Sequence, residues 1–396
     1  MKATIPIDNP ERLRLERQHE GRENWRLWGP YLAERAWGTV REDYSAHGEA
    51  WEHLDHDQSR SRAYRWNEDG LGGICDERQR LCFALALWNG RDPILKERAF
   101  GLTGNQGNHG EDVKEYYFYL DATPSHSYLR YLYKYPQAEY PYGGLVEENR
   151  RRGRLDPPFN LLDAGVFDGN RYWDVDVSYA KAGPDEIHIR ITAANRGARA
   201  RRPCTCCRNC GSATPGLGAT RRRNGRWRNC GAIRSITRPE TGQAELARDD
   251  SARPARAWAV RAEHPTLGAY HLYGRQSAEP LYTENEHNAQ RLWGLANATP
   301  YVKDSFHRRV VNGEQDAVNP AREGTKFAAW HALTVAGGQQ AQIELVLSAA
   351  PLAQPFAASA NGVRRPPVGS GCVLPRPAAR MPPTKTGVSC AKRRPA

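Results

Sequence analysis

The chain of 396 residues has a formal net charge of +12 at pH 7, 39% hydrophobic residues and a mean hydropathy of −0.77. This length suits one large domain or two domains, and no window approaches the ~20 consecutive apolar residues of a membrane-spanning helix. The first residues lack the apolar run of a secretory signal, so we expect a cytoplasmic protein with no membrane partner.

Two segments hold all of the excess positive charge. Residues 199–248 carry a net +10 and residues 361–396 carry +8, so the rest of the chain carries −6. A nucleic-acid-binding domain usually gathers lysine and arginine on a folded face, whereas the part of this chain that is expected to fold is mildly acidic. We therefore expect no nucleic-acid partner.

The chain begins with a predicted helical segment, residues 1–26, because Pro10 to Arg26 is rich in Glu, Arg and Leu. Beyond it, residues 27–197 are predicted to form the first part of a β-sandwich domain. Within this part, the stretch from Trp25 to Pro141 mixes aromatic, acidic and arginine side chains without repeating itself. Aromatic rings stack on the faces of sugars, and guanidinium and carboxylate groups form hydrogen bonds with sugar hydroxyls, so this composition favours saccharide binding.

Two motifs in that stretch supply the candidate substrate-binding residues. An alternative is that these side chains hold long loops by aromatic packing and by arginine–carboxylate pairing, since buried charges usually occur in pairs; this structural role is the preferred interpretation. The candidates are Trp37, Arg41 and Glu42 in WGTVRED, and Trp66, Glu68 and Asp69 in RWNEDG.

Two further groups of polar residues have weaker patterns. Glu97, His109, Glu111 and Asp112 lie around a glycine-rich turn, where a histidine is more often a loop residue than a ligand. His53, Asp55, His56 and Asp57 match no metal-binding spacing, and a solvated loop is preferred. No metal and no cofactor are therefore expected.

A run of tyrosines and two cysteines complete the first part of the chain. The tyrosines form either a stacking surface or strands with a packed face. Cys75 and Cys82 lie in a segment that is predicted to be a buried strand, so reduced core thiols are expected. The tyrosines are Tyr116, Tyr117, Tyr119, Tyr128, Tyr131, Tyr133 and Tyr135.

Residues 172–195 predict an antiparallel hairpin. Apolar and polar residues alternate from Trp173 to Tyr179 and again from Ile187 to Ile191, with a turn at Ala182 to Asp185. A second strand pair is predicted over Trp330 to Ser348, joined at Gly337-Gly338. Strand pairs separated by long loops indicate a mainly β fold, a large antiparallel β-sandwich that continues in residues 251–350.

The segment 198–250 between these strands is anomalous, because it is rich in arginine and cysteine and has no apolar face. The CxxC spacing of Cys207 and Cys210 fits half of a zinc site, but the second half is missing. The segment is otherwise expected to be a disordered basic loop.

We hypothesise that this segment is translated out of frame. The last base of the Cys206 codon and the first two bases of the Cys207 codon together encode leucine. When the window from Pro203 to Gly218 is read in this shifted frame, it becomes an apolar, strand-like sequence. The basic tail 351–396 is also expected to be disordered. When its codons are read from the second base, part of it too becomes compatible with a sequence of a folded protein. The nucleotide sequence tests this hypothesis, because codons without those hidden phases would contradict it.

Several motifs, in order, resemble the N-terminal region of bacterial proteins of glycoside hydrolase family sixty-three, the mannosyl-oligosaccharide glucosidase-like α-glucosidases. The resemblance covers Arg12 to Asn195 and resumes at Leu281 to Gly294 and Tyr301 to Val335. It implies a β-sandwich that precedes an (α/α)6 catalytic barrel, and inverting hydrolysis of α-glucosidic bonds by an Asp acid and a Glu base. Both of these carboxylates belong to the barrel.

No amphipathic helical repeat follows Ser348, so the barrel is expected to be absent, and no residue here matches the family's catalytic positions. The resemblance therefore implies the β-sandwich part of a glycosidase, catalytically incomplete as this chain. Its partners would be an oligosaccharide or α-glucoside and the missing C-terminal barrel. The alternative is a non-catalytic carbohydrate-binding or docking module.

Overall fold

The computed structural model describes residues 9–34, 56–63, 70–102, 106–108, 112–197 and 257–357, and the backbone of two strands at 212–214 and 226–232. The α-helices of these residues are short: α1 (Pro10–His19), α2 (Tyr142–Arg151), α3 (Ala289–Trp293) and α4 (Ser305–Val310). Short 3-10 turns lie at Gln58–Arg60, Asp168–Asn170 and Gln315–Ala317. Within the part that is described, every helix is too short or too polar to cross a membrane.

Helix α1 confirms the first ten residues of the predicted N-terminal helix. The side chain of Asn9 caps it by accepting from the Glu11 amide at 2.9 Å, and Gly21, with φ +70°, follows its end. The Glu11 carboxylate accepts from the amide of Ser125 at 2.6 Å and from the hydroxyl of Ser127 at 3.1 Å. These bonds attach the helix to the turn between two strands of the main sheet.

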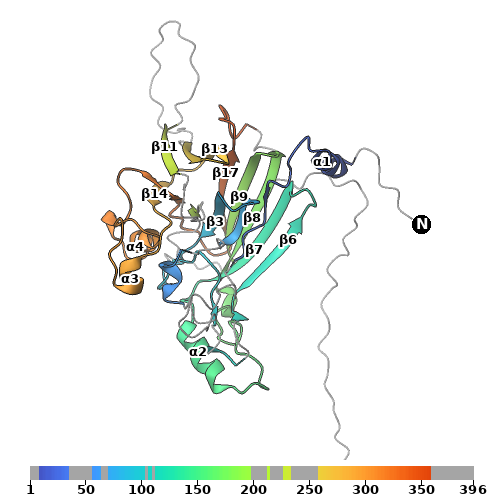
Figure 1. Cartoon of the computed structure of the whole chain (residues 1–396). Coiled ribbons are helices and arrows are strands. Elements are labelled where there is room, and N and C mark those ends of the chain that lie inside the picture. Colours follow the sequence, from blue (N-terminus) through green and yellow to red (C-terminus); the bar gives the residue numbers. More distant parts are fainter. Residues whose placement is uncertain are drawn as a thin grey trace, which may run out of the picture.

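The main sheet has nine antiparallel strands (Figure 1). Its order runs β15-β11-β12-β13-β17-β9-β8-β7-β6. The strands are β15 (Glu323–Gly324), β11 (Arg226–Ala232), β12 (Trp258–His264), β13 (Gly268–Gly274), β17 (Gln340–Ser348), β9 (Glu186–Asn195), β8 (Tyr172–Gly183), β7 (Tyr128–Pro136) and β6 (Tyr116–Ala122).

A second layer covers one face of this sheet. It contains the four-stranded sheet β1-β2-β3-β10, and β10 lies beside the pair β14–β16. A further short pair, β4–β5, lies close to α2. The strands are β1 (Trp28–Gly29), β2 (Leu71–Asp76), β3 (Cys82–Ala86), β10 (Ser212–Thr214), β14 (Glu279–Thr283), β16 (Lys326–Trp330), β4 (Gly101–Leu102) and β5 (Asp112–Val113).

The two layers enclose a continuous hydrophobic core. Phe83 and Ile74 of the second layer pack with Trp173 and Leu272 of the main sheet. Trp28 of β1 is fully buried; its ring meets Tyr270 of β13 edge-on at 5.2 Å, and its Nε1 donates to the Tyr270 hydroxyl at 3.0 Å. The mainly β, sandwich-like fold that the sequence predicts is confirmed.

The hairpin prediction for residues 172–195 is also confirmed. β8 and β9 pair along their whole length, from Trp173 opposite Asn195 to Gly183 opposite Glu186. The alternating apolar residues lie in the core, as period-two patterning requires. Tyr128, Tyr131, Tyr133 and Tyr135 of β7 are buried, whereas Tyr119 on the edge strand β6 is 62% exposed.

The predicted second hairpin, over Trp330 to Ser348, is wrong. β17 pairs with β9 and β13, and the strand before the glycines, β16, ends at Trp330 and pairs with β14. The carbonyl of Val335 accepts from the side chain of Asn195 at 2.9 Å instead of from a paired strand. Gly337-Gly338 therefore makes a turn between layers and not between paired strands.

Two strands lie within residues 198–250, where the sequence predicted no regular structure. β10 pairs with β3, and β11 pairs with β12 and β15. Strand pairing uses backbone groups, which every residue except proline supplies in full, so a polar segment can extend an open sheet edge. The remainder of the segment, with Cys207 and Cys210, lies outside the described residues, as do residues 358–396.

Cys75 and Cys82 are buried and unlinked, as predicted for core thiols. They lie opposite each other on β2 and β3 and pack with Leu32.

Candidate binding site

The six candidate substrate-binding residues predicted from the sequence lie outside the described residues, which exclude 35–55 and 64–69. Their role stays a prediction. The same holds for His53, Asp55, His109 and Glu111, and only the backbone of Asp112 is described, in β5. The candidates concerned are Trp37, Arg41, Glu42, Trp66, Glu68 and Asp69.

Glu97 is a structural residue. Its carboxylate forms a buried ion pair with Lys326 of β16 at 2.5 Å. Burial alone would raise the pKa of this carboxyl, but the charges of Lys326 and Lys303 outweigh it and hold the pKa below its ordinary value. Glu97 is therefore ionised and joins two segments of the fold.

Of the four residues considered for a metal, the two that are described, His56 and Asp57, have other roles. His56 stacks on Tyr142 with ring centroids 4.1 Å apart and meets Phe100 edge-on at 4.4 Å. Asp57 forms ion pairs with Arg60 and Arg291. No group of three metal-ligating side chains occurs in the described ranges.

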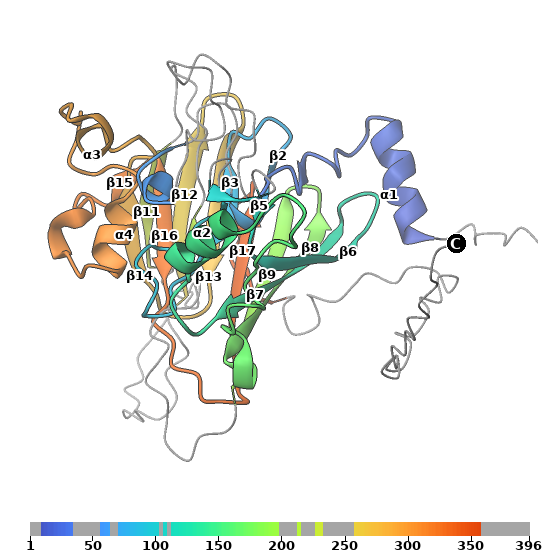
Figure 2. The same ribbon diagram turned by 90° about the horizontal axis from the view of Figure 1, so that it is seen from below.

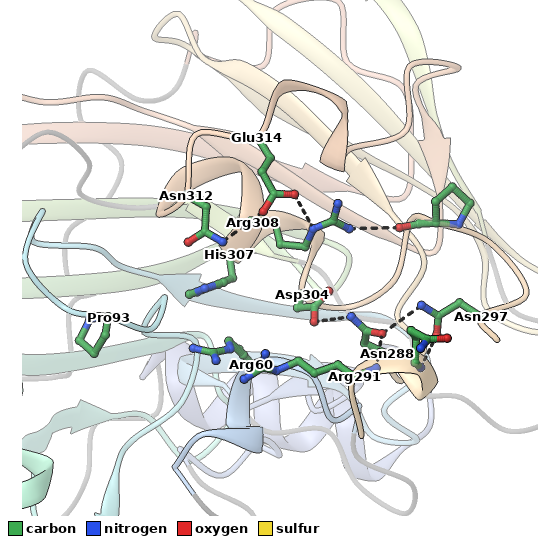
Figure 3. A pocket seen from close by; sticks show the side chains of 12 residues that line it. Arg60, Pro93, Asn288, Arg291, Asn297, Asp304, His307, Arg308, Asn312 and Glu314 are labelled. Carbon is green, nitrogen blue, oxygen red and sulfur yellow. Dashed lines mark hydrogen bonds and ion pairs between the residues drawn. The ribbon is translucent and has the colours of Figure 1, made fainter. Parts of the chain in front are cut away.

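A polar cavity of about 780 Å³ lies where α3 and α4 meet the 3-10 turn Gln58–Arg60 (Figure 3). In Figures 1 and 2, α3 and α4 lie together beside β14, on the side of the fold away from α1. The sequence analysis singled out none of the residues that line the cavity. They are Arg60, Pro93, Asn288, Gln290, Arg291, Asn297, Pro300, Asp304, His307, Arg308, Asn312 and Glu314.

One wall of the cavity is held in place by the capping of α3. The side chain of Asn288 accepts from the Arg291 amide at 3.0 Å, and Gly294, with φ +70°, ends the helix in the left-handed conformation. Asn297 folds back onto this helix, donating to the Asn288 side chain at 3.0 Å and accepting from the Gln290 amide at 3.2 Å. The amide side chains therefore have fixed positions at this wall.

Asp304 connects the walls of the cavity through hydrogen bonds. It is 2% exposed, and its Oδ2 accepts from the Ser61 hydroxyl at 2.7 Å and from the Asn288 side chain at 2.8 Å. Ser61 follows the 3-10 turn, and Asn288 precedes α3. One buried carboxylate thus joins three segments that are far apart in the sequence.

Arginines supply the charge of the cavity. Arg60 and Arg291 both donate to the exposed Asp57, at 2.8 Å in each case. Burial lowers the pKa of the Arg60 guanidinium first, and the like charge of Arg291 lowers it further. At the other end, Arg308 donates to Glu314 at 2.8 Å.

Glu314 has the properties of a charged hydrogen-bond acceptor. Hydrogen bonds from Asn312 and Arg308 and the charge of Arg308 hold the pKa of its carboxyl below the ordinary value. A general acid needs the opposite shift, which burial or a like charge produces. Glu314 is therefore suited to accept hydrogen bonds from a ligand and unsuited to donate a proton.

His307 lies in the cavity wall as a neutral ring. Its Nδ1 accepts from the Leu95 amide at 3.2 Å, so the neutral ring carries its proton on Nε2. Burial, followed by the charge of Arg60, lowers the pKa of His307 to about 4. Since the unfolded chain has a pKa near 6.5, the neutral ring contributes stability above pH 6.5 that is lost as pH falls through about 4.

Changing His307→Asn should therefore flatten the pH dependence of stability in this window. The Asn oxygen can replace Nδ1 as acceptor for the Leu95 amide, but it does not titrate. Urea unfolding between pH 6.5 and pH 4 measures the slope. Part of the slope should remain, because burial also lowers the pKa of His331 to about 4. Equal slopes for the variant and the natural chain would contradict this account.

Sequence reasoning missed this cavity because each of its residues is ordinary by itself. Its lining comes mainly from Asn288 to Glu314, and all of these residues except Asn297 and Pro300 lie inside the two segments at which the family resemblance resumes. The signal that could have found it is the concentration of amide and arginine side chains in NEHNAQR and HRRVVNGEQ.

The chain is similar to the uncharacterized protein YMR196W of Saccharomyces cerevisiae. The two are 39% identical over 348 residues, an alignment that covers 81% of this chain and 30% of the yeast protein. The chain thus corresponds to less than a third of the length of that relative. No protein-family model matches the chain.

Proposed function

We propose that this chain is the β-sandwich part of a longer, glycosidase-like protein, and that its polar cavity holds a saccharide while hydrolysis takes place in another part. The observation that carries the proposal is the lining of the cavity, in which four amide side chains and three guanidinium groups surround about 780 Å³. Amides both donate and accept hydrogen bonds, and guanidiniums donate in fixed directions, which suits a ligand with many hydroxyls. The volume is within the usual range for small-molecule sites.

The carboxylates of the cavity favour binding over catalysis. Inverting glycosidases need one carboxyl as acid and one as base on opposite sides of the bond. Glu314 is held ionised by Asn312 and Arg308. The buried Asp304 already accepts from Ser61 and Asn288 through Oδ2, while its Oδ1 has no hydrogen-bond partner among the described residues. This arrangement also supports the second candidate, a carbohydrate-binding module with no catalytic role.

Titration of the purified chain with maltose, followed by calorimetry, tests the proposal. We expect binding without release of glucose. Asn312→Ala and Gln290→Ala, at exposed positions of the lining, should each weaken binding about two- to tenfold, the effect of one hydrogen bond. Glu147→Gln on the exposed face of α2 is the matched control and should bind as the natural chain does.

Two results would contradict the proposal. Absence of saccharide binding would remove the role of the cavity. Steady release of glucose by the purified chain would show that an acid and a base are present after all. The two candidates are separated by adding the remaining part of the longer protein, since only a part of a hydrolase should then become active.

A further inference from the structure

Arg60 and Arg291 form a pair of like charges at one end of the cavity, on the wall below His307 and Asp304 in Figure 3. They come from segments far apart in the sequence, and they share Asp57 as their carboxylate partner. Asp57 is exposed at the margin, with 67% of its side chain accessible, and is outside the lining. Among the described residues, the carboxylates that act on Arg60 are this solvated Asp57 and the buried Asp304.

The hydrogen bonds of the two arginines leave donors for a ligand. Within the described part of the chain, each guanidinium bonds Asp57 through Nη2 alone. The Nε and Nη1 groups of Arg60 and Arg291 have no such partner. Arg308 differs, because its Nε donates to Glu314 and its Nη1 lies 3.5 Å from the Pro300 carbonyl oxygen.

The pKa shifts of neighbouring groups show that the charges of Arg60 and Arg291 act on each other and on His307. The repulsion between Arg291 and Arg60 affects Arg60 more than either Asp57 or Asp304 does. At His307, Arg60 is the strongest charged influence, ahead of the buried Asp304. An anion between the two guanidiniums would relieve this repulsion through charge-assisted, bidentate bonds.

We propose that the cavity takes an acidic saccharide, whose carboxylate or phosphate lies between Arg60 and Arg291 while its hydroxyls meet the amide side chains of the lining. This inference rests on the proposed function, since it names the class of saccharide that the same cavity binds. These amides belong to Asn288, Gln290 and Asn297 at α3 and to Asn312 near Glu314.

The test compares glucuronate, glucose 6-phosphate, glucose and inorganic phosphate as ligands of the full chain by calorimetry. We expect either acidic sugar to bind at least about tenfold more tightly than glucose, the effect of one charge-assisted bond. The acidic sugar that binds more tightly identifies the anion. Arg60→Gln and Arg291→Gln should each reduce the preference, and Arg60→Lys should restore part of it.

Two variants make the test specific. Asp57→Asn removes the competing carboxylate and should widen the preference for acidic sugars. Arg151→Gln changes an exposed arginine of α2 outside the lining, so it should leave the preference unchanged. Thermal melting of each variant checks folding, and Arg291, with 39% of its side chain exposed, tolerates substitution more readily than Arg60.

The outcomes separate this inference from the proposed function. Equal affinities for glucose and for both acidic sugars would overturn the inference and leave saccharide binding intact. If inorganic phosphate binds and none of the sugars does, both the inference and the proposed function would be overturned, since the cavity would then be a simple anion site. A narrower preference in Asp57→Asn would also overturn the inference, because it would show that Asp57 helps to hold the ligand.

Discussion

Replacing Lys96 with methionine is expected to destabilise the fold by about 3–5 kcal/mol, the usual loss when one member of a buried ion pair is removed. The Lys96 amine lies 2.6 Å from the Glu115 carboxylate, and the two side chains are 0% and 1% exposed. Methionine fills a similar volume, so the main consequence is a buried carboxylate without its cation.

The surroundings of Glu115 explain why the loss should be large. Its second oxygen accepts from the Tyr133 hydroxyl of β7 at 2.8 Å, and the Lys96 amine lies 3.6 Å from the centre of the Phe100 ring. Burial raises the pKa of the Glu115 carboxyl even against the nearby charge of Lys96. Without that charge the carboxyl must take up a proton or draw in water, and the contact between the layers loosens.

Urea unfolding at neutral pH measures this loss. Arg130→Met is the matched control, because it breaks the Arg130–Asp176 pair on the partly exposed face of β7 and β8 and should cost less than about 1 kcal/mol. The double variant Lys96→Met with Glu115→Leu should recover part of the loss, since no buried charge then remains. A loss in Lys96→Met as small as that of the control would show that water reaches Glu115.

The main sheet could be predicted from the sequence where strands that are neighbours in the sequence also pair with each other. The alternation from Trp173 to Ile191 contains both strands of a hairpin and the turn between them, so pairing needs no distant partner. Residues 340–348 have an equally clear alternation, but the pattern does not say which strand lies beside them. Their apolar face packs best between β9 and β13, and this long-range choice overrides the nearby Gly337-Gly338 turn.

The cavity was harder to predict because its contacts join distant residues. Ser61 meets Asp304 across 243 positions, and Asp57 meets Arg291 across 234. The spacing of apolar residues along the sequence does not indicate such long-range contacts. The sequence instead drew attention to tryptophan-rich motifs around Trp37 and Trp66, whose composition resembles sugar sites. The short segment between these motifs, from Gln58 to Ser61, is the one that reaches the cavity.

Asp304→Ala is expected to dismantle the cavity and to destabilise the fold by about 2–4 kcal/mol, since one buried and one partly buried donor lose a charged acceptor. The donors are the Ser61 hydroxyl and the Asn288 side chain, at 2.7 and 2.8 Å. Asn288 also caps α3 and holds Asn297, so its release should free the amide side chains at α3. Saccharide affinity should therefore fall by more than in any substitution at the exposed lining.

Asp304→Asn separates the two roles of this carboxylate. Its remaining oxygen can still accept from Ser61 and Asn288, so the geometry of α3 should persist with a smaller loss of stability. The negative charge beside Arg60 and His307 is removed, however, and both groups feel the Asp304 charge. The positive potential at the arginine pair should then rise, and acidic sugars should bind Asp304→Asn more tightly than they bind the natural chain. Equal stability of Asp304→Asn and Asp304→Ala would mean that Asp304 does not hold α3. An affinity of Asp304→Asn for acidic sugars no higher than that of the natural chain would mean that the Asp304 charge does not influence the arginines.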